Sequence, residues 1–383
     1  MGERGFRLGV MDPLVPTVAA PEMLTRLDYV GAAAARVDSF WVPDHLNSLM
    51  PRALWTRQHS AASRLAPRID AVFEPWTMLG RISARNRLAG LRLGIGVTDP
   101  SRRHPAVTAQ AAATLNLLTR GRMILGIGAG EREANEPYGI DFSTPVARFE
   151  EALATIRALW ESKGALVNRD SPYFPLRDAV FDLPAYQGTW PDVWVAAHGP
   201  RMLRAAGRYG DGWFPAFTQR PVDYARRLDA VRAAASDAGR DPLAVTPALW
   251  MPVITGRTAD DVDEAMASPL VKSFALNASD DFYRRHGAEH PLGAGFTGAL
   301  DNLPFTLDER AALAAVERVP DAVMRDVFLC GTPDEIVDRA AEWRDHGVRY
   351  LVVANQSPSQ RRLGKAIGSS IVFQRLLGRL RRL

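Results

Sequence analysis

Two histidines directly follow segments that we predict to be strands. His45 comes after Asp44 at the end of one such segment, and His198 precedes Gly199 and Pro200 at the end of another. An imidazole titrates near neutral pH and can donate a proton to a developing alkoxide. His45 is therefore the first candidate for proton transfer, with a core histidine satisfied by Asp44 as the structural alternative. The Gly-Pro pair after His198 is typical of a helix start and indicates a residue that shapes a pocket.

A carboxylate, Glu131, follows three glycines at positions 126, 128 and 130. Glycine lets the backbone approach a ligand closely, so this carboxylate can lie beside a bound molecule. A first-turn acidic residue that complements a helix dipole is the alternative. The run is not a dinucleotide-binding fingerprint, because Glu131 stands where the G-x-G-x-x-G spacing requires the last glycine. The backbone amides of this loop, with Asn135, can still hold a phosphate.

These candidates need a fold that brings the ends of strands together. Apolar segments alternate with alanine- and leucine-rich amphipathic segments about eight times, which favours a (β/α)₈ barrel with insertions. An open doubly wound sheet is the structural alternative. In a barrel the side chains past the carboxyl ends of the strands share one mouth. The predicted strands are residues 6–11, 39–42, 91–98, 123–127, 192–197, 213–216, 245–255 and 350–354.

The remaining segments interrupt this alternation without a change in composition. We therefore predict one domain, residues 1–383, with insertions near 46–80, 164–188 and 277–320. The C-terminal segment 364–383 has an apolar face surrounded by arginines and is predicted to form an amphipathic helix. Such a helix usually packs against the barrel or another subunit. The alternative is shallow contact with an anionic membrane.

Composition excludes several classes of protein. Of the 383 residues, 47% are hydrophobic and 23% are charged, which is typical of a globular protein. The net charge of +4 arises from basic residues spread along the chain, which disfavours nucleic-acid binding. The single cysteine, Cys330, excludes an intramolecular disulfide, and the histidines lack metal-ligand spacing, so we expect no metal. No apolar run approaches ~18 residues, so we expect no transmembrane segment and a cytoplasmic location.

Several longer strings resemble a known family. Residues 41–45 (WVPDH), 104–110 (HPAVTAQ), 128–131 (GAGE), 196–201 (AAHGPR) and 331–335 (GTPDE) resemble the bacterial-luciferase-like superfamily, in its branch that depends on coenzyme F420, a deazaflavin. Residues 74–80, 130–139 and 340–347 are similar to reductases of long-chain lipid ketones in that branch.

The resemblance implies a function and roles for individual residues. It implies a barrel with F420 across its mouth, and a hydride transferred from reduced deazaflavin to a lipid ketone to give a secondary alcohol. It also implies that His45 donates the proton, with Asp44 beside the ring and Glu131 as a carboxylate near it. A cis peptide is expected within 95–97. The implied cofactor contacts are Asp44, Ile95, Gly96, Val97, Thr98, Gly128, Gly130, Asn135, His198, Gly199, Pro200 and Trp213.

Further expectations and alternatives concern the substrate, the cofactor and the assembly. Candidate walls for a wide apolar mouth are the aromatic residues at positions 55, 73, 76, 173, 174, 181 and 186. The alternatives are an FMN-dependent monooxygenase on the same barrel, and a non-catalytic barrel that binds a cofactor or lipid. Deazaflavin has carbon where flavin has N5 and reacts poorly with oxygen. The identity of the bound cofactor therefore distinguishes the F420-dependent reductase from the FMN-dependent monooxygenase. We expect a homodimer, with peripheral contact at the inner face of the membrane as a further expectation.

Overall fold

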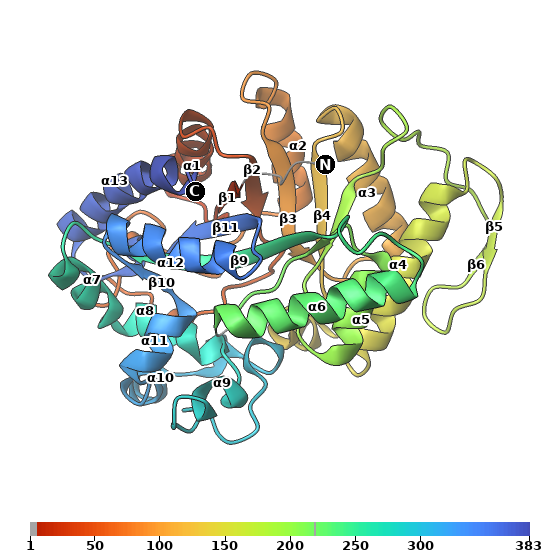
Figure 1. Ribbon diagram of the computed structural model, residues 1–383. Helices are drawn as coiled ribbons and strands as arrows, with labels where there is room; N and C mark the ends of the chain where they lie inside the picture. The colour runs from red at the N-terminus through yellow and green to blue at the C-terminus, as the bar shows by residue number, and fades with distance from the viewer. Residues whose placement is uncertain (1–5, 218–219) are drawn as a thin grey trace.

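The computed structural model describes residues 6–217 and 220–383, and its centre is a closed parallel barrel surrounded by helices (Figure 1). Eight of the nine strands of the main sheet form the ring, and β11 closes it by pairing with β1 on one side and β9 on the other. The predicted (β/α)₈ barrel is confirmed, and the open doubly wound sheet is wrong. The ring strands in order are β1 (Arg7–Met11), β2 (Ser39–Val42), β3 (Arg92–Thr98), β4 (Met123–Ile127), β7 (Asp192–Val195), β8 (Gly212–Trp213), β9 (Thr246–Thr255) and β11 (Tyr350–Asn355).

The strands are apolar on both faces because each face packs against a different core. Inside the barrel, Trp41, Trp194 and Tyr350 are fully buried and their rings contact one another. Gly94 on β3 makes room for this cluster, since a Cβ there would overlap the Trp41 ring. The outward side chains form a larger core against the helices. Burial on both sides is the normal state of strands in a parallel barrel.

The helices around the barrel begin at recognisable caps. Thr332 and Glu335 form a capping box at the start of α12, with proline at the first turn, and the Glu74 side chain caps α2. Helix α2 begins within the segment 46–80 that we predicted to be an insertion and extends beyond it, and it is the barrel helix between β2 and β3. The helices packed on the barrel are α1 (Met23–Ala34), α2 (Pro75–Arg85), α3 (Pro105–Leu118), α4 (Pro145–Glu161), α5 (Pro200–Tyr209), α6 (Pro221–Asp237), α12 (Pro333–Asp345) and α13 (Leu363–Leu380).

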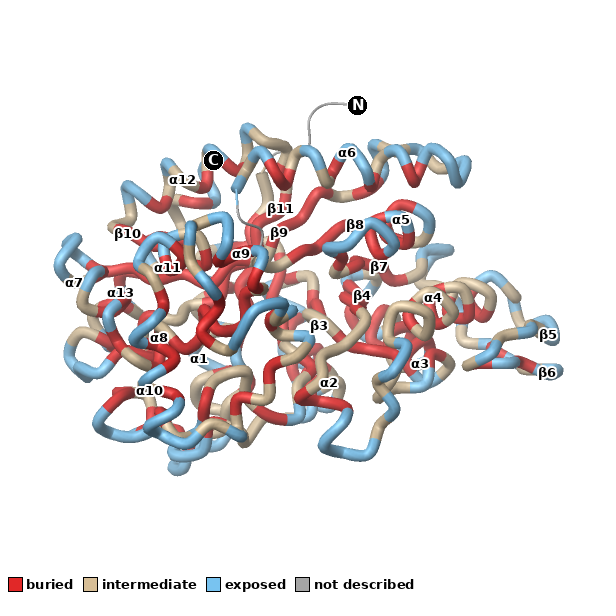
Figure 2. Tube along the Cα trace, turned by 90° about the horizontal axis from the view of Figure 1, so that it is seen from below, coloured by how far each residue is buried: buried red, intermediate tan, exposed pale blue. Residues whose placement is uncertain are grey.

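Two segments extend beyond the barrel. The antiparallel pair β5 (Val167–Arg169) and β6 (Leu176–Ala179) lies in the predicted segment 164–188 and projects from the barrel (Figure 2). The second follows β9 and has its own apolar core, whose buried members include Phe274, Phe282 and Phe328. It begins before the predicted residue 277 and ends after 320. It comprises α7 (Ala259–Met266), α8 (Pro269–Phe274), α9 (Asp280–Arg284), α10 (Glu309–Glu317), α11 (Asp321–Val327) and β10 (Leu329–Gly331).

The C-terminal helix docks on the barrel. One face of α13 buries Phe373, Leu376 and Leu380 in the outer core, and Val372 is buried on the same helix. Helix α13 lies beside α12 and α1 (Figure 1). In the part of the chain that the structure describes, no helix combines the length and hydropathy needed to cross a bilayer.

Candidate active site

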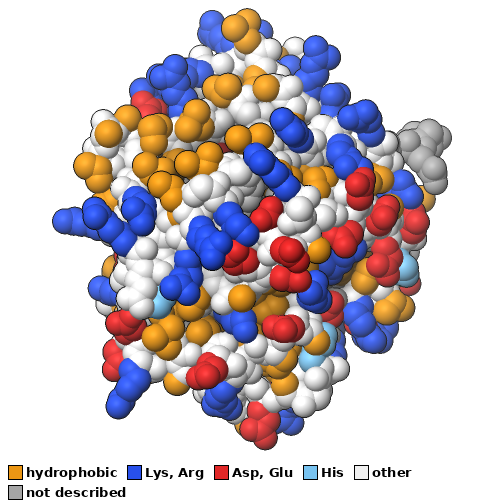
Figure 3. Space-filling view, turned by 90° about the vertical axis from the view of Figure 1, so that its left-hand side faces the viewer, with side chains coloured by type: hydrophobic (Ala, Val, Ile, Leu, Met, Phe, Trp, Pro, Cys, Tyr) orange, Lys and Arg blue, Asp and Glu red, His pale blue; other side chains and the backbone are white. Residues whose placement is uncertain are grey.

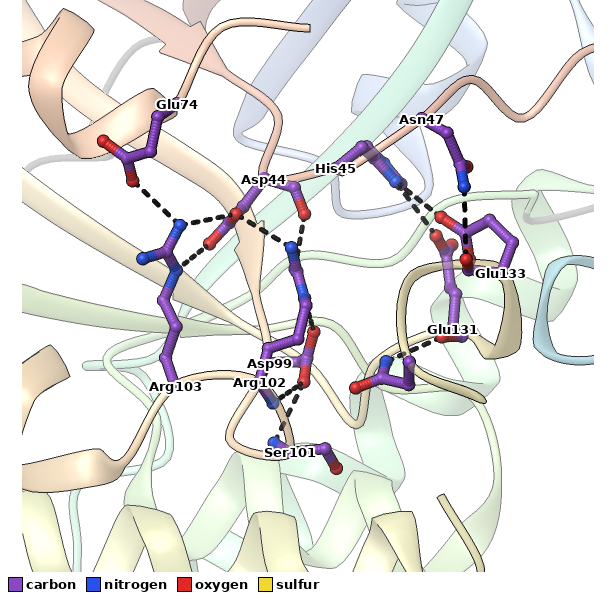
Figure 4. A network of polar contacts seen from close by, with 11 residues as sticks. Asp44, His45, Asn47, Glu74, Asp99, Ser101, Arg102, Arg103, Glu131 and Glu133 are labelled. Atoms are coloured by element: carbon purple, nitrogen blue, oxygen red, sulfur yellow. Dashed lines mark hydrogen bonds and ion pairs between the residues drawn. The ribbon is translucent and has the colours of Figure 1, made fainter. Parts of the chain in front are cut away.

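His45 lies at the carboxyl end of β2 with its ring directed at two glutamates (Figure 4). Its Nδ1 is 3.0 Å from Glu133 Oε1 and 3.4 Å from Glu131 Oε2. Burial would lower the pKa of His45, but the charges of Glu131 and Glu133 outweigh it and raise the pKa to about 9. The imidazole is therefore a cation at neutral pH and can act as an acid. The alternative of a core histidine held by Asp44 is wrong, because the partners of the ring are the two glutamates.

The two glutamates differ in environment. Glu133 is fully buried, and its Oε2 is a buried oxygen without a hydrogen bond. Burial and the charge of Glu133 raise the pKa of Glu131 to about 7. The ligand atoms of His45, Glu131 and Glu133 all lie within 4.8 Å of one another, a spacing that a metal ion could bridge.

Asp44 is held by two arginines from the loop after β3 (Figure 4). Arg103 Nε donates to Asp44 Oδ2 at 2.8 Å, and Arg102 donates to Asp44 Oδ1 at 3.2 Å and to its backbone oxygen at 2.5 Å. Arg102 also pairs with Asp99 at 2.8 Å. Burial would raise the pKa of Asp44, but the two guanidinium groups outweigh it and the pKa is lowered. The charged network fixes the backbone immediately before His45.

Most of the predicted site residues line one cavity of about 1470 Å³ at the carboxyl end of the barrel. The lining residues among them are Asp44, His45, Gly96, Val97, Gly128, Gly130, Glu131, His198, Gly199 and Pro200. The peptide bond between Gly96 and Val97 is cis, within the expected range, and the β3–β4 register shifts there.

Ile95, Thr98, Asn135 and Trp213 do not line this cavity. Ile95 and Thr98 are fully buried in β3. Trp213 packs outward in the core beneath α6, where its Nε1 donates to the Ala197 oxygen at 2.9 Å. The expected direct contact of Trp213 with a cofactor does not fit this outward position. Asn135 Nδ2 donates to the Glu131 backbone oxygen at 2.7 Å, so this side chain positions the carboxylate.

Comparison with known proteins places the chain in a family. The sequence model of a family described as luciferase-like monooxygenase matches residues 29–350. The chain belongs to this family.

Several curated relatives of this luciferase-like chain share one name. The phthiodiolone/phenolphthiodiolone dimycocerosates ketoreductase of Mycobacterium sp. (strain JLS) is 62% identical over 99% of this chain and 100% of the relative. The protein of that name from Mycobacterium tuberculosis (strain H37Rv) is 54% identical over the same shares. The solved structure of an F420-dependent secondary alcohol dehydrogenase with an F420–acetone adduct has a TM-score of 0.73, 18% identity, and coverage of 98% of this chain and 99% of that one. The luciferase-like chain is an oxidoreductase.

The walls of the cavity in this luciferase-like oxidoreductase differ from those we expected. Of the seven predicted aromatic positions, only Trp55 lines it. Phe174 packs against His104, and Phe181 against Trp190, both away from the mouth. The aromatic walls come instead from the ends of the later strands and from the helical segment after β9. They are Phe214, Phe217, Trp250, Phe274 and Phe282.

Three charged residues of the site were missed in the sequence analysis. Glu133 is two residues beyond the predicted Glu131, and Arg102 and Arg103 lie in the loop that follows β3. All three share the pattern that identified His45, because each is an ionisable side chain shortly after a predicted strand. In this luciferase-like fold the three side chains contact Asp44 or His45 in the loop that follows β2.

Proposed function

We propose that this protein reduces the keto group of a long-chain lipid to a secondary alcohol, with reduced F420 as the hydride donor. The observation that carries the proposal is the imidazolium of His45, held between two carboxylates at the wall of a large apolar cavity. The ketoreductase name of the mycobacterial relatives supports a substrate of the phthiodiolone or phenolphthiodiolone dimycocerosate class. The secondary alcohol dehydrogenase of the same fold acts with F420.

The volume of the cavity supports binding of a cofactor beside a second ligand. At about 1470 Å³ it exceeds the ~300–1,000 Å³ of ordinary small-molecule sites. Gly128 packs close to Val97, since a Cβ at Gly128 would lie 3.1 Å from Val97 Cγ2, and a Cβ at Gly199 would meet nothing within 4 Å. These backbone segments, with Gly96 and Gly130, would hold the cofactor. When bound, F420 supplies the hydride.

His45 supplies the proton that the reduction consumes. The Nδ1–H stays hydrogen-bonded to Glu133, so the proton on Nε2 is the one available to the carbonyl oxygen of a ketone. After donation the ring is neutral, and its remaining proton lies on Nδ1 between the carboxylates. Asp44 and the arginines fix the position of the ring relative to the mouth, while Glu131 and Glu133 keep the acid form populated at neutral pH.

Cofactor titration tests the identity of the hydride donor. We expect F420 to bind with a spectral change and FMN to bind much more weakly, because the alternative is an FMN-dependent monooxygenase. Tight binding of FMN without binding of F420 would replace the proposal by that alternative. Binding of F420 without turnover of any lipid ketone would favour the non-catalytic barrel.

We also propose that the protein acts in the cytoplasm as a homodimer, with its basic C-terminal helix close to the inner face of the membrane. The lipid substrate class supports a location near a bilayer. Light scattering should give a mass near that of two 42.0-kDa chains. A mass of one chain at micromolar concentration would contradict the homodimer.

A further inference from the structure

The cavity that contains His45 does not end at the mouth of the barrel. Its lining continues outward between α1 and α13, along side chains that are far from the polar site in sequence. Leu27 and Val30 of α1 line one side and are 59% and 54% exposed. Ile367 and Ile371 of α13 line the other side and are 56% and 47% exposed. We call this extension, lined by these four residues, the α1–α13 groove.

The groove is apolar where a docked surface helix is normally polar. Helix α13 buries one apolar face in the core, yet Leu363, Ile367 and Ile371 recur every four residues on another face and stay exposed. Single exposed apolar residues are common, but a contiguous apolar surface marks a binding site. Figure 3 shows the face of the molecule that carries α13, where hydrophobic side chains gather among Lys and Arg side chains.

We propose that the α1–α13 groove holds an acyl chain of the lipid whose carbonyl group lies at His45. The inference rests on the proposed function and adds to it the path of the chain. The groove residues and the polar site line one continuous cavity, so an acyl chain can extend from His45 into the groove without leaving it. A chain much longer than the barrel mouth must leave it, and this is a route on which it would stay in contact with apolar side chains.

The two helices touch beside the groove. Gly31 of α1 faces Gln374 of α13 so closely that a Cβ at Gly31 would clash with the Gln374 side chain, and both residues line the cavity. The end of the Gln374 side chain therefore lies directly over Gly31, which brings α1 and α13 into contact beside the groove.

The junction between the groove and the barrel mouth contains a pair of carboxyl groups, Asp12 and Asp28. Asp12 Oδ1 accepts from Leu14 N at 2.8 Å and Thr25 Oγ1 at 2.9 Å, which holds this side chain in place. Burial and the adjacent Asp12 raise the pKa of Asp28 well above its usual value. A raised pKa favours the neutral acid, which is less strongly hydrated than a carboxylate and costs less to bring into contact with an apolar chain.

The experiment separates the groove from the reaction centre. Ile371→Trp and Val30→Trp each place a bulky ring in the groove, and Leu88→Trp places one on the fully exposed Leu88 outside the cavity as the matched control. The first readout is the binding of the fluorescent fatty acid cis-parinaric acid to protein without cofactor. We expect the groove variants to weaken it about tenfold, the effect of losing contact with roughly two methylene groups, and the control to leave it unchanged.

The second readout is kcat/KM with F420 for two ketones, butanone and a symmetrical ketone with two long alkyl chains. We expect the groove variants to reduce the long-chain value about tenfold and to leave butanone unchanged. Two results would overturn the inference while leaving the proposed function in place. One is an equal loss of kcat/KM for both ketones. The other is unchanged kcat/KM for both ketones together with unchanged probe binding. If wild-type protein reduces neither ketone, the proposed function fails, and probe binding still decides the groove. A change of mass from dimer to monomer in the groove variants, with unchanged probe binding, would assign the surface to a second copy and overturn the inference.

Discussion

Replacing Glu133 by glutamine tests the electrostatic basis of the site. The two glutamates raise the pKa of His45 from 6.5 to about 9, a shift equivalent to about 3 kcal/mol. Glu133 makes the closer contact, so Glu133→Gln should lower this pKa by at least about one unit. At pH 8.5 the protonated fraction of His45 would then fall from about three quarters to about one quarter. At pH 6 it would remain nearly complete.

The assay is an NMR titration of the histidine rings in protein without cofactor, which has seven histidines, with His45→Ala to identify the signal. Ketone reduction measured in parallel should fall about threefold at pH 8.5 and little at pH 6. Glu136→Gln is the matched control, because Glu136 lies in the same loop but pairs with Arg132. An unchanged His45 pKa in Glu133→Gln, or an equal shift in the control, would refute the reasoning.

Three further changes test the surroundings of the site. Arg102→Met should lower the free energy of unfolding by about 3 kcal/mol in a urea titration, because the substitution removes one of the two arginines that pair with the buried Asp44 carboxylate. A loss below ~1 kcal/mol would contradict this prediction. Asp28→Asn should raise Tm more at pH 8 than at pH 4. The raised pKa means that Asp28 binds more protons in the folded protein than in the unfolded chain, so the aspartate lowers stability as pH rises. An equal gain in Tm at both pH values would contradict this prediction. Leu376→Ala should cost about 3 kcal/mol in the same urea assay, since Leu376 is fully buried in the core, and a change within ~0.5 kcal/mol would show that α13 is not docked in solution.

The barrel could be predicted because its strands are buried on both faces. Segments such as residues 123–127 and 350–354 are short, apolar and flanked by turns, and alternate with amphipathic helices. Helix α2 was not predicted because the long irregular loop before it has no hydrophobic periodicity. The whole segment 46–80 was therefore predicted to be one insertion. The helices after β9 are short, between five and nine residues, and pack on one another. Periodicity over so few residues does not distinguish a helix from a loop.

The site could be predicted in part for a related reason. His45 and Glu131 lie where strand ends meet, and barrel topology brings such positions together. Glu133 was missed because burial of an acidic side chain depends on its partner, and nothing local indicates that His45, 88 residues away, would be that partner. Trp213 was expected to contact the cofactor because of the family resemblance. Alternation along a two-residue strand is too short to indicate which face its side chain occupies.

An anaerobic single-turnover measurement tests the central claim most directly. Protein loaded with reduced F420 is mixed at pH 7 with a long-chain ketone, and the return of oxidised F420 is followed by absorbance in wild-type protein and in His45→Ala. We expect oxidation of the cofactor with formation of the secondary alcohol, about 10²-fold slower in the variant at unchanged cofactor affinity. Oxidation at equal rates in the two proteins, or no oxidation by wild-type protein with any lipid ketone, would contradict it.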